Sequence, residues 1–65
     1  MRWERIPDVV TPEEAATLMA RIKDELGGDW EAAHHQADDV LCALLRFYGQ
    51  HEIVQAFDSL DKWYA

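Results

Sequence analysis

The tetrapeptide Thr-Pro-Glu-Glu at residues 11–14 is the feature that most constrains the fold of this chain. Thr11 can cap a helix, Pro12 suits the first helical position, and Glu14 stands where it completes a capping box. Apolar residues then recur at helical spacing, namely Ala15, Leu18, Met19, Ile22 and Leu26. Gly27 and Gly28 follow, and glycine commonly ends a helix by adopting a left-handed conformation. We therefore predict a helix over residues 11–27.

Two further helices are predicted from the spacing of the apolar residues. Asp29 can cap a helix over residues 30–48 that ends at Gly49. Its predicted buried face consists of Trp30, Ala33, Ala37, Val40, Leu41, Leu44, Leu45 and Tyr48. A third helix is predicted over residues 50–60, with an apolar side made of Ile53, Val54, Ala56, Phe57 and Leu60. Three helices with short connections indicate an all-α fold, a small three-helix bundle.

The residues before the first helix are predicted to form an extended arm. Pro7 lacks a backbone donor and biases Ile6 toward an extended conformation. We expect the apolar residues of the arm to lie on the helices, namely Trp3, Ile6, Val9 and Val10. The first residues do not resemble a secretory signal, and no stretch approaches the roughly 20 apolar residues that a membrane span needs. A cytoplasmic protein that does not bind membranes is expected.

Length and cysteine content indicate a single small domain over residues 1–65. A chain of 65 residues is near the lower limit for folding alone, although 49% of its residues are hydrophobic. A homodimer is therefore one possible state. Cys42 is the only cysteine, which excludes an intrachain disulfide and favours a reducing compartment. We interpret Cys42 as a residue at the edge of the core and not as a nucleophile, because a helix interior does not lower a thiol pKa.

The net charge of −7 lies within residues 8–45, which hold nine acidic and two basic side chains. Such a segment repels nucleic acid phosphates, so direct nucleic acid binding is not expected. A protein partner with a basic surface is expected instead, although acidic surfaces also serve solubility alone. The expected partner-binding residues are Asp24, Glu25, Asp29, Glu31, Asp38, Asp39, Trp30, Trp63 and Tyr64. The aromatic residues in this set can act as interface hot spots or simply cover a small bundle.

Residues 29–39, Asp-Trp-Glu-Ala-Ala-His-His-Gln-Ala-Asp-Asp, divide into two sets on a helix. Glu31, His34 and Asp38 border the predicted apolar face and have a spacing that can supply three metal ligands. One helix alone does not complete such a site, so metal binding would need His51 or Glu52 as well, or a dimer. The alternative is a partly buried pair in which His34 donates to Asp38. His35 and Asp39 are predicted to face water, where they can form an ordinary ion pair along the helix.

The order D-x-E-A-A-H-x-x-A-D-x-x-L-C from Asp29, followed by L-L-R-F-Y-G and the ending D-K-W-Y-A, resembles short uncharacterised proteins encoded by bacteriophages and prophages. The resemblance covers residues 29–65 and implies a helical accessory protein, with no catalytic assignment for any residue. No phosphate-binding loop or nucleophile motif is present in the sequence.

The expected function is therefore non-enzymatic binding of a host protein, which the chain modulates or inhibits. One form of it is an acidic surface that mimics nucleic acid, as in anti-CRISPR inhibitors. The alternative is a metal-binding domain or metal-dependent enzyme built on Glu31, His34 and Asp38 and completed in a dimer.

Overall fold

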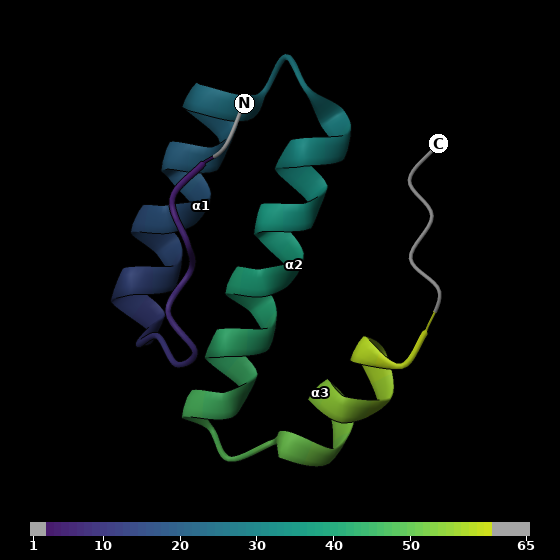
Figure 1. Ribbon diagram of the computed structural model, residues 1–65. Helices are drawn as coiled ribbons and strands as arrows, with labels where there is room; N and C mark the ends of the chain where they lie inside the picture. The colour runs from purple at the N-terminus through teal and green to yellow at the C-terminus, as the bar shows by residue number, and fades with distance from the viewer. Residues whose placement is uncertain (1–2, 61–65) are drawn as a thin grey trace.

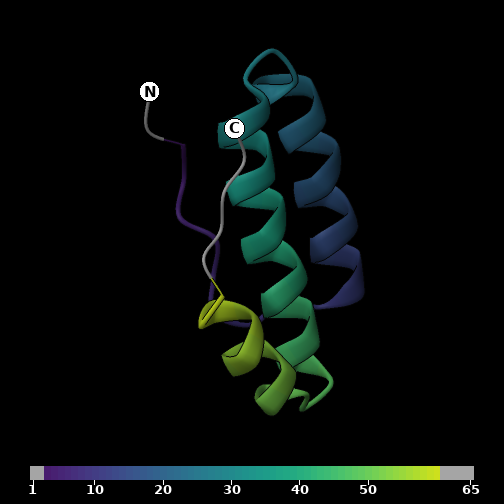
Figure 2. The same ribbon diagram turned by 90° about the vertical axis from the view of Figure 1, so that its right-hand side faces the viewer.

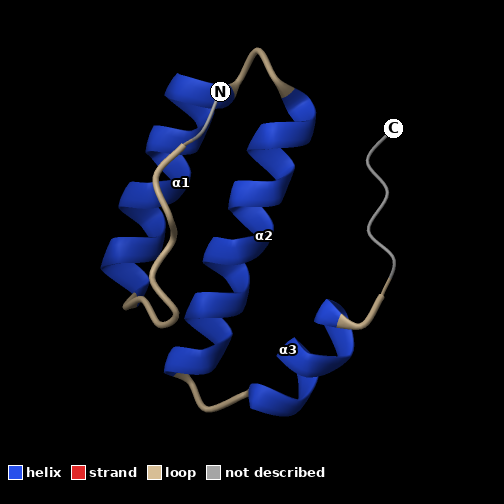
Figure 3. Ribbon diagram, viewed as in Figure 1, coloured by secondary structure: helices blue, strands red, loops and turns tan. Residues whose placement is uncertain are grey.

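The computed structural model describes residues 3–60, which form three α-helices joined by short turns (Figures 1 and 3). α1 spans Pro12–Leu26, α2 spans Trp30–Phe47 and α3 spans His51–Asp58. No strand occurs among the described residues. The predicted all-α fold with three helices is confirmed, and each helix begins and ends within two residues of its predicted bounds.

The N-terminus of α1 has the predicted capping box. The Glu14 backbone N–H donates to Thr11 Oγ1 at 3.2 Å, and the Thr11 backbone N–H donates to Glu14 Oε1 at 2.8 Å. The predicted left-handed ending of α1 is wrong, since Gly27 has a right-handed φ of −61°. Glycine is required there for a different reason, because a Cβ atom at Gly27 would lie 2.5 Å from the Lys23 carbonyl oxygen. The left-handed glycine is Gly49, after α2, with φ of 76°.

The core lies between α1, α2 and the N-terminal arm. α1 and α2 form an antiparallel pair, and the extended arm runs along one face of this pair (Figures 1 and 2). The buried core cluster is made of Ile6, Val10, Ala15, Ile22, Leu26, Val40 and Ala43. Leu18 and Met19 of α1 pack against it, so the predicted buried face of α1 is confirmed. The arm thus supplies two core residues to a hairpin of helices.

The arm is fixed to α2 through Val10. The Val10 side chain is 1% exposed, and its backbone N–H donates to the Ala43 carbonyl oxygen over 3.4 Å. Ile6 is also buried, as predicted for the arm. Val9 differs from the prediction, since its side chain is 50% exposed. Asp8 and Val9 form a bend, so the extended path predicted for the arm is interrupted just before Val10.

α3 packs on α2 at the side opposite to α1 (Figure 1). Only Val54 of α3 is buried, and it does not belong to the core cluster. Ile53 and Leu60 remain exposed although their spacing predicted an apolar contact face. Within the described residues, α1 and α3 make no helix–helix contact. α3 is therefore held by a small contact with one neighbour.

The buried face of α2 differs from the prediction. Trp30, Leu41 and Tyr48 are exposed, whereas Cys42 and Ala43 are buried. Apolar residues occupy more than half of the circumference of α2, so helical spacing alone does not determine which part faces the core. The arm selects the side that carries Ala43, and this leaves Leu41 and Trp30 outside the core.

Candidate functional site

The three predicted metal ligands lie along α2 outside the core. Glu31 and His34 are exposed and Asp38 is half-buried, so the partial burial predicted for His34 is wrong. Between residues 3 and 60, no three His, Cys, Asp or Glu side chains lie close enough together to hold a metal ion. His51 and Glu52 thus do not complete the site within the described chain, and metal binding by a dimer stays a prediction.

The other charged residues of this segment behave as its helical geometry predicted. His35 and Asp39 are both exposed on α2 and thus face water. Asp29 is the N-cap of α2, where its Oδ1 accepts a hydrogen bond from the Ala32 backbone N–H at 3.1 Å. The carboxylate of Asp29 therefore stabilises the helix start.

The turn between α1 and α2 carries an exposed tryptophan among acidic residues. Trp30 is the first residue of α2 and its side chain is 80% exposed. Asp29 and Glu31 flank it in the sequence, and Asp24 is exposed near the end of α1. A large exposed aromatic side chain at an acidic tip is an arrangement typical of interface hot spots. We call these four residues the acidic tip.

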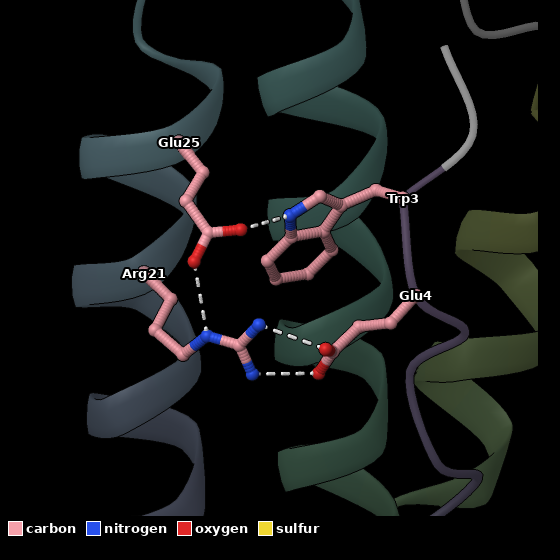
Figure 4. Close-up of polar contacts among 4 residues, drawn as sticks. All are labelled: Trp3, Glu4, Arg21 and Glu25. Atoms are coloured by element: carbon pink, nitrogen blue, oxygen red, sulfur yellow. Dashed lines mark hydrogen bonds and ion pairs between the residues drawn. The ribbon is translucent and has the colours of Figure 1, made fainter.

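A second cluster joins the arm to α1 (Figure 4). Trp3 Nε1 donates to Glu25 Oε1 at 2.8 Å, and the Arg21 guanidinium lies over the Trp3 ring, 5.2 Å from its centroid. Arg21 also donates from both terminal nitrogens to the two carboxylate oxygens of Glu4, each at 2.8 Å, and from Nε to Glu25 at 3.3 Å. The four residues Trp3, Glu4, Arg21 and Glu25 form a latch that holds the arm against α1.

The latch changes the interpretation of two residues. By helical spacing Arg21 lies opposite the apolar residues of α1, yet its side chain is half-buried because it contacts Trp3 and Glu4 of the arm. Glu25 was expected to bind a partner, but its carboxylate already accepts hydrogen bonds from Trp3 and Arg21. These two hydrogen bonds, first that from Trp3 and then that from Arg21, lower the pKa of Glu25. Glu25 therefore helps to hold the arm, and its role in partner binding stays a prediction.

An apolar groove of about 200 Å³ lies between α2 and α3. It is lined by Asp38, Leu41, Cys42, Leu45, Ile53 and Phe57. Leu41 is 51% exposed and Ile53 is 56% exposed, although both are branched aliphatic side chains. Sequence reasoning missed this groove because it assigned Leu41, Leu45, Ile53 and Phe57 to buried faces. The one available signal in the sequence was Asp38, an acidic residue that borders the predicted apolar face of α2.

The electrostatic environment of this groove is negative. Asp38 Oδ2 is buried and accepts no hydrogen bond within the described part of the chain. Burial raises the pKa of the Cys42 thiol; Asp58, Asp39 and Asp38 raise it further, and Arg46 opposes them. The raised pKa agrees with the interpretation of Cys42 as unreactive, and its burial places it within the packing. Asp38 lines the groove with a negative charge. Asp39, Arg46 and Asp58 line a second cleft that shares Cys42 with the groove.

A larger cleft of about 540 Å³ lies on the arm side of α2. Arg46 donates to the Asp8 carbonyl oxygen at 3.0 Å and lies 3.8 Å from Asp58, while Arg5 lies 3.6 Å from Asp8. The arginines of this cleft thus already pair with acidic or carbonyl groups of the chain. We interpret the contacts of Arg46 in this cleft as structural, because they join α2 to the arm and to α3.

Comparisons with known proteins assign this chain to no family. No protein-family model matches it, and no curated protein or solved structure matches it significantly. None of the described helices is long and apolar enough to cross a membrane. Trp63 and Tyr64, which were expected to bind a partner, lie outside the described residues.

Proposed function

We propose that this chain is a small acidic accessory protein, of the phage or prophage type, that binds a host protein with a basic surface and modulates or inhibits it. The observation that carries the proposal is the acidic tip, where Trp30 is 80% exposed beside Asp29 and Glu31. Burying an exposed indole stabilises a complex, and surrounding carboxylates select a basic partner. Binding in this proposal needs no catalytic group.

In one form of the proposed function, the acidic surface mimics nucleic acid and occupies a nucleic-acid-binding groove of the partner. The exposed acids Asp24, Glu31 and Asp39 support it, together with the net charge of −7. Glu25 contributes less to such a surface, because its carboxylate is engaged in the latch. Mimicry depends on charge, so binding should weaken strongly as salt is added.

The test is quantitative capture of host proteins on the full chain and on matched variants. Trp30→Ala should abolish capture of the specific partner, whereas Tyr48→Ala, a change at an exposed aromatic residue at the other end of α2, should retain it. A further variant, Asp24→Asn with Glu31→Gln, should reduce capture at low salt. Equal capture by all variants would refute the acidic tip as a binding surface, and capture that is insensitive to salt would refute mimicry.

A further inference from the structure

The apolar groove between α2 and α3 is incompletely filled by the described residues. Leu41 and Ile53 keep about half of their surface exposed at its edges, and Leu45 and Phe57 form its walls. Exposed apolar side chains that gather in a concave site mark interaction surfaces more often than isolated ones do. An apolar cavity of roughly 150 Å³ accepts a benzene ring, so the groove has room for one large apolar side chain.

One polar atom in this groove distinguishes it from an ordinary packing defect. Asp38 Oδ2 is buried beside the apolar lining, yet it accepts no hydrogen bond from the described chain. Buried carboxylate oxygens are stabilised by donors, above all by charged ones. The half-buried Asp38 carboxylate therefore adds a negative charge to an otherwise apolar lining, which fits a ligand that carries a cation near a large apolar side chain.

The charge of the surroundings decides between a basic partner and a second copy. Asp38 is the charged residue in the lining of the groove, while Asp39, Asp58 and Arg46 line the larger cleft, which shares Cys42 with it. A second copy would bring another chain of net charge −7 against this surface. Like charges at an interface disfavour association, whereas a basic segment gains from the same field.

We propose that the α2–α3 groove is a docking site for an amphipathic basic segment of a protein partner, which places one large apolar side chain against Leu41 and Ile53 and a lysine or arginine against Asp38. This inference rests on the proposed function and adds the chemistry of the partner. It also assigns the groove a role separate from that of the acidic tip, which begins at the other end of α2.

The probe is a synthetic helical peptide of about 15 residues, with leucines along one face and lysines elsewhere. The matched peptide has glutamates in place of the lysines. Binding of both peptides to the full chain is measured by calorimetry at low salt. The lysine peptide should bind, and the glutamate peptide should bind at least about tenfold more weakly.

Two pairs of variants locate the binding. Leu41→Ser and Val9→Ser remove apolar side chains of nearly equal exposure, 51% and 50%, inside and outside the groove. Asp38→Asn inside the groove and Glu13→Gln, at an exposed position of α1 outside it, change the net charge equally. Each groove variant should raise the Kd of the lysine peptide about fivefold or more, and each control should raise it less than about twofold. Helicity and melting temperature confirm that all four fold, and Leu41→Ala replaces any Leu41→Ser protein that does not.

Four results would overturn the inference. Equal losses in the groove variants and their controls would show that the peptide binds by net charge alone, and equal binding of both peptides would show that charge does not select it. Sedimentation that shows a dimer lost on Leu41→Ser would assign the groove to a second copy. Changes in the Leu41 and Ile53 methyl resonances on Trp63→Ala, without peptide, would assign it to residues 61–65 of the same chain.

The proposed function is tested separately. If the groove variants bind the lysine peptide normally while Trp30→Ala loses the captured host protein, the groove inference fails and the proposed function stands. If the lysine peptide does not bind at low salt, the groove inference fails regardless of capture. If the full chain captures no host protein at low salt, the proposed function is refuted.

Discussion

The two sides of α2 differ in what packs against them. On one side, α1 and the arm enclose Val40 and Ala43 completely, and hydrogen bonds and the latch hold the arm in place. On the other side, α3 buries only Val54 and leaves Leu41 and Ile53 about half exposed. One helix of a very small protein thus contributes one side to the closed core and leaves apolar side chains exposed on the other.

The largest predicted difference comes from matched valine substitutions on the two sides. Val40 is 0% exposed and Val54 is 3% exposed, so each Val→Ala change removes the same buried atoms. Val40→Ala should lower the free energy of unfolding by about 2 kcal/mol. The substitution leaves a cavity in the core between α1, α2 and the arm, where neighbouring side chains have little room to fill it. Val54→Ala should cost about 1 kcal/mol or less, since α3 can shift to fill the space.

Urea denaturation of both variants measures this difference directly. The slope of the free energy against urea should be unchanged if both proteins unfold in one step. Equal losses in the two variants would contradict the division of α2 into a stabilising side and an open side.

A second pair compares two tryptophans. Trp3→Ala removes the hydrogen bond to Glu25, the contact with Arg21 and packing against the core, and should cost about 1–2 kcal/mol. Trp30→Ala removes an exposed side chain and should change stability by less than about 0.5 kcal/mol. Thermal unfolding of both variants is the measurement. A larger loss for Trp30→Ala would show that the acidic tip is part of the stabilising packing.

The latch also predicts a dependence on pH. The pKa of Glu25 is lowered in the folded chain, so its contribution is present above the ordinary glutamate pKa of about 4.3 and is lost as pH falls through the lowered value. Glu25→Gln should therefore flatten part of the fall in melting temperature below about pH 4. Glu13→Gln, at an exposed position of α1, is the control and should leave the acid slope unchanged. Identical acid slopes in both variants would contradict the role given to Glu25.

Local signals determined what the sequence could predict. The capping box at Thr11 and the cap at Asp29 act within four residues, so the helix starts follow from the sequence. The latch was not predictable, although Arg21 and Glu25 have the spacing of an ion pair, because Glu4 and Trp3 reach them only through the path of the arm. The buried side of α2 depends on the same path. The groove was missed for this reason, and Leu41 was assigned to the core.

The smallest predicted effect concerns Asp38. Its Oδ2 accepts no hydrogen bond within residues 3–60, so Asp38→Asn removes no observed hydrogen bond at that atom. We expect the melting temperature to stay the same or rise slightly, which is typical of a residue retained for binding and not for stability. Asp29→Asn is the comparison at a capping position, where asparagine also caps well. A loss above about 1 kcal/mol for Asp38→Asn would indicate a structural role instead.

Native-state hydrogen exchange, residue by residue, tests the division of α2 most directly. Amides of α1 and of the α2 turns around Val40 should exchange only with global unfolding, since they lie in the closed core. Amides of α3 around Val54 should exchange through a local opening of lower free energy, because α2 is the only described helix that α3 contacts. The account predicts two separate groups of exchange free energies. A single value shared by α1, α2 and α3 would contradict it.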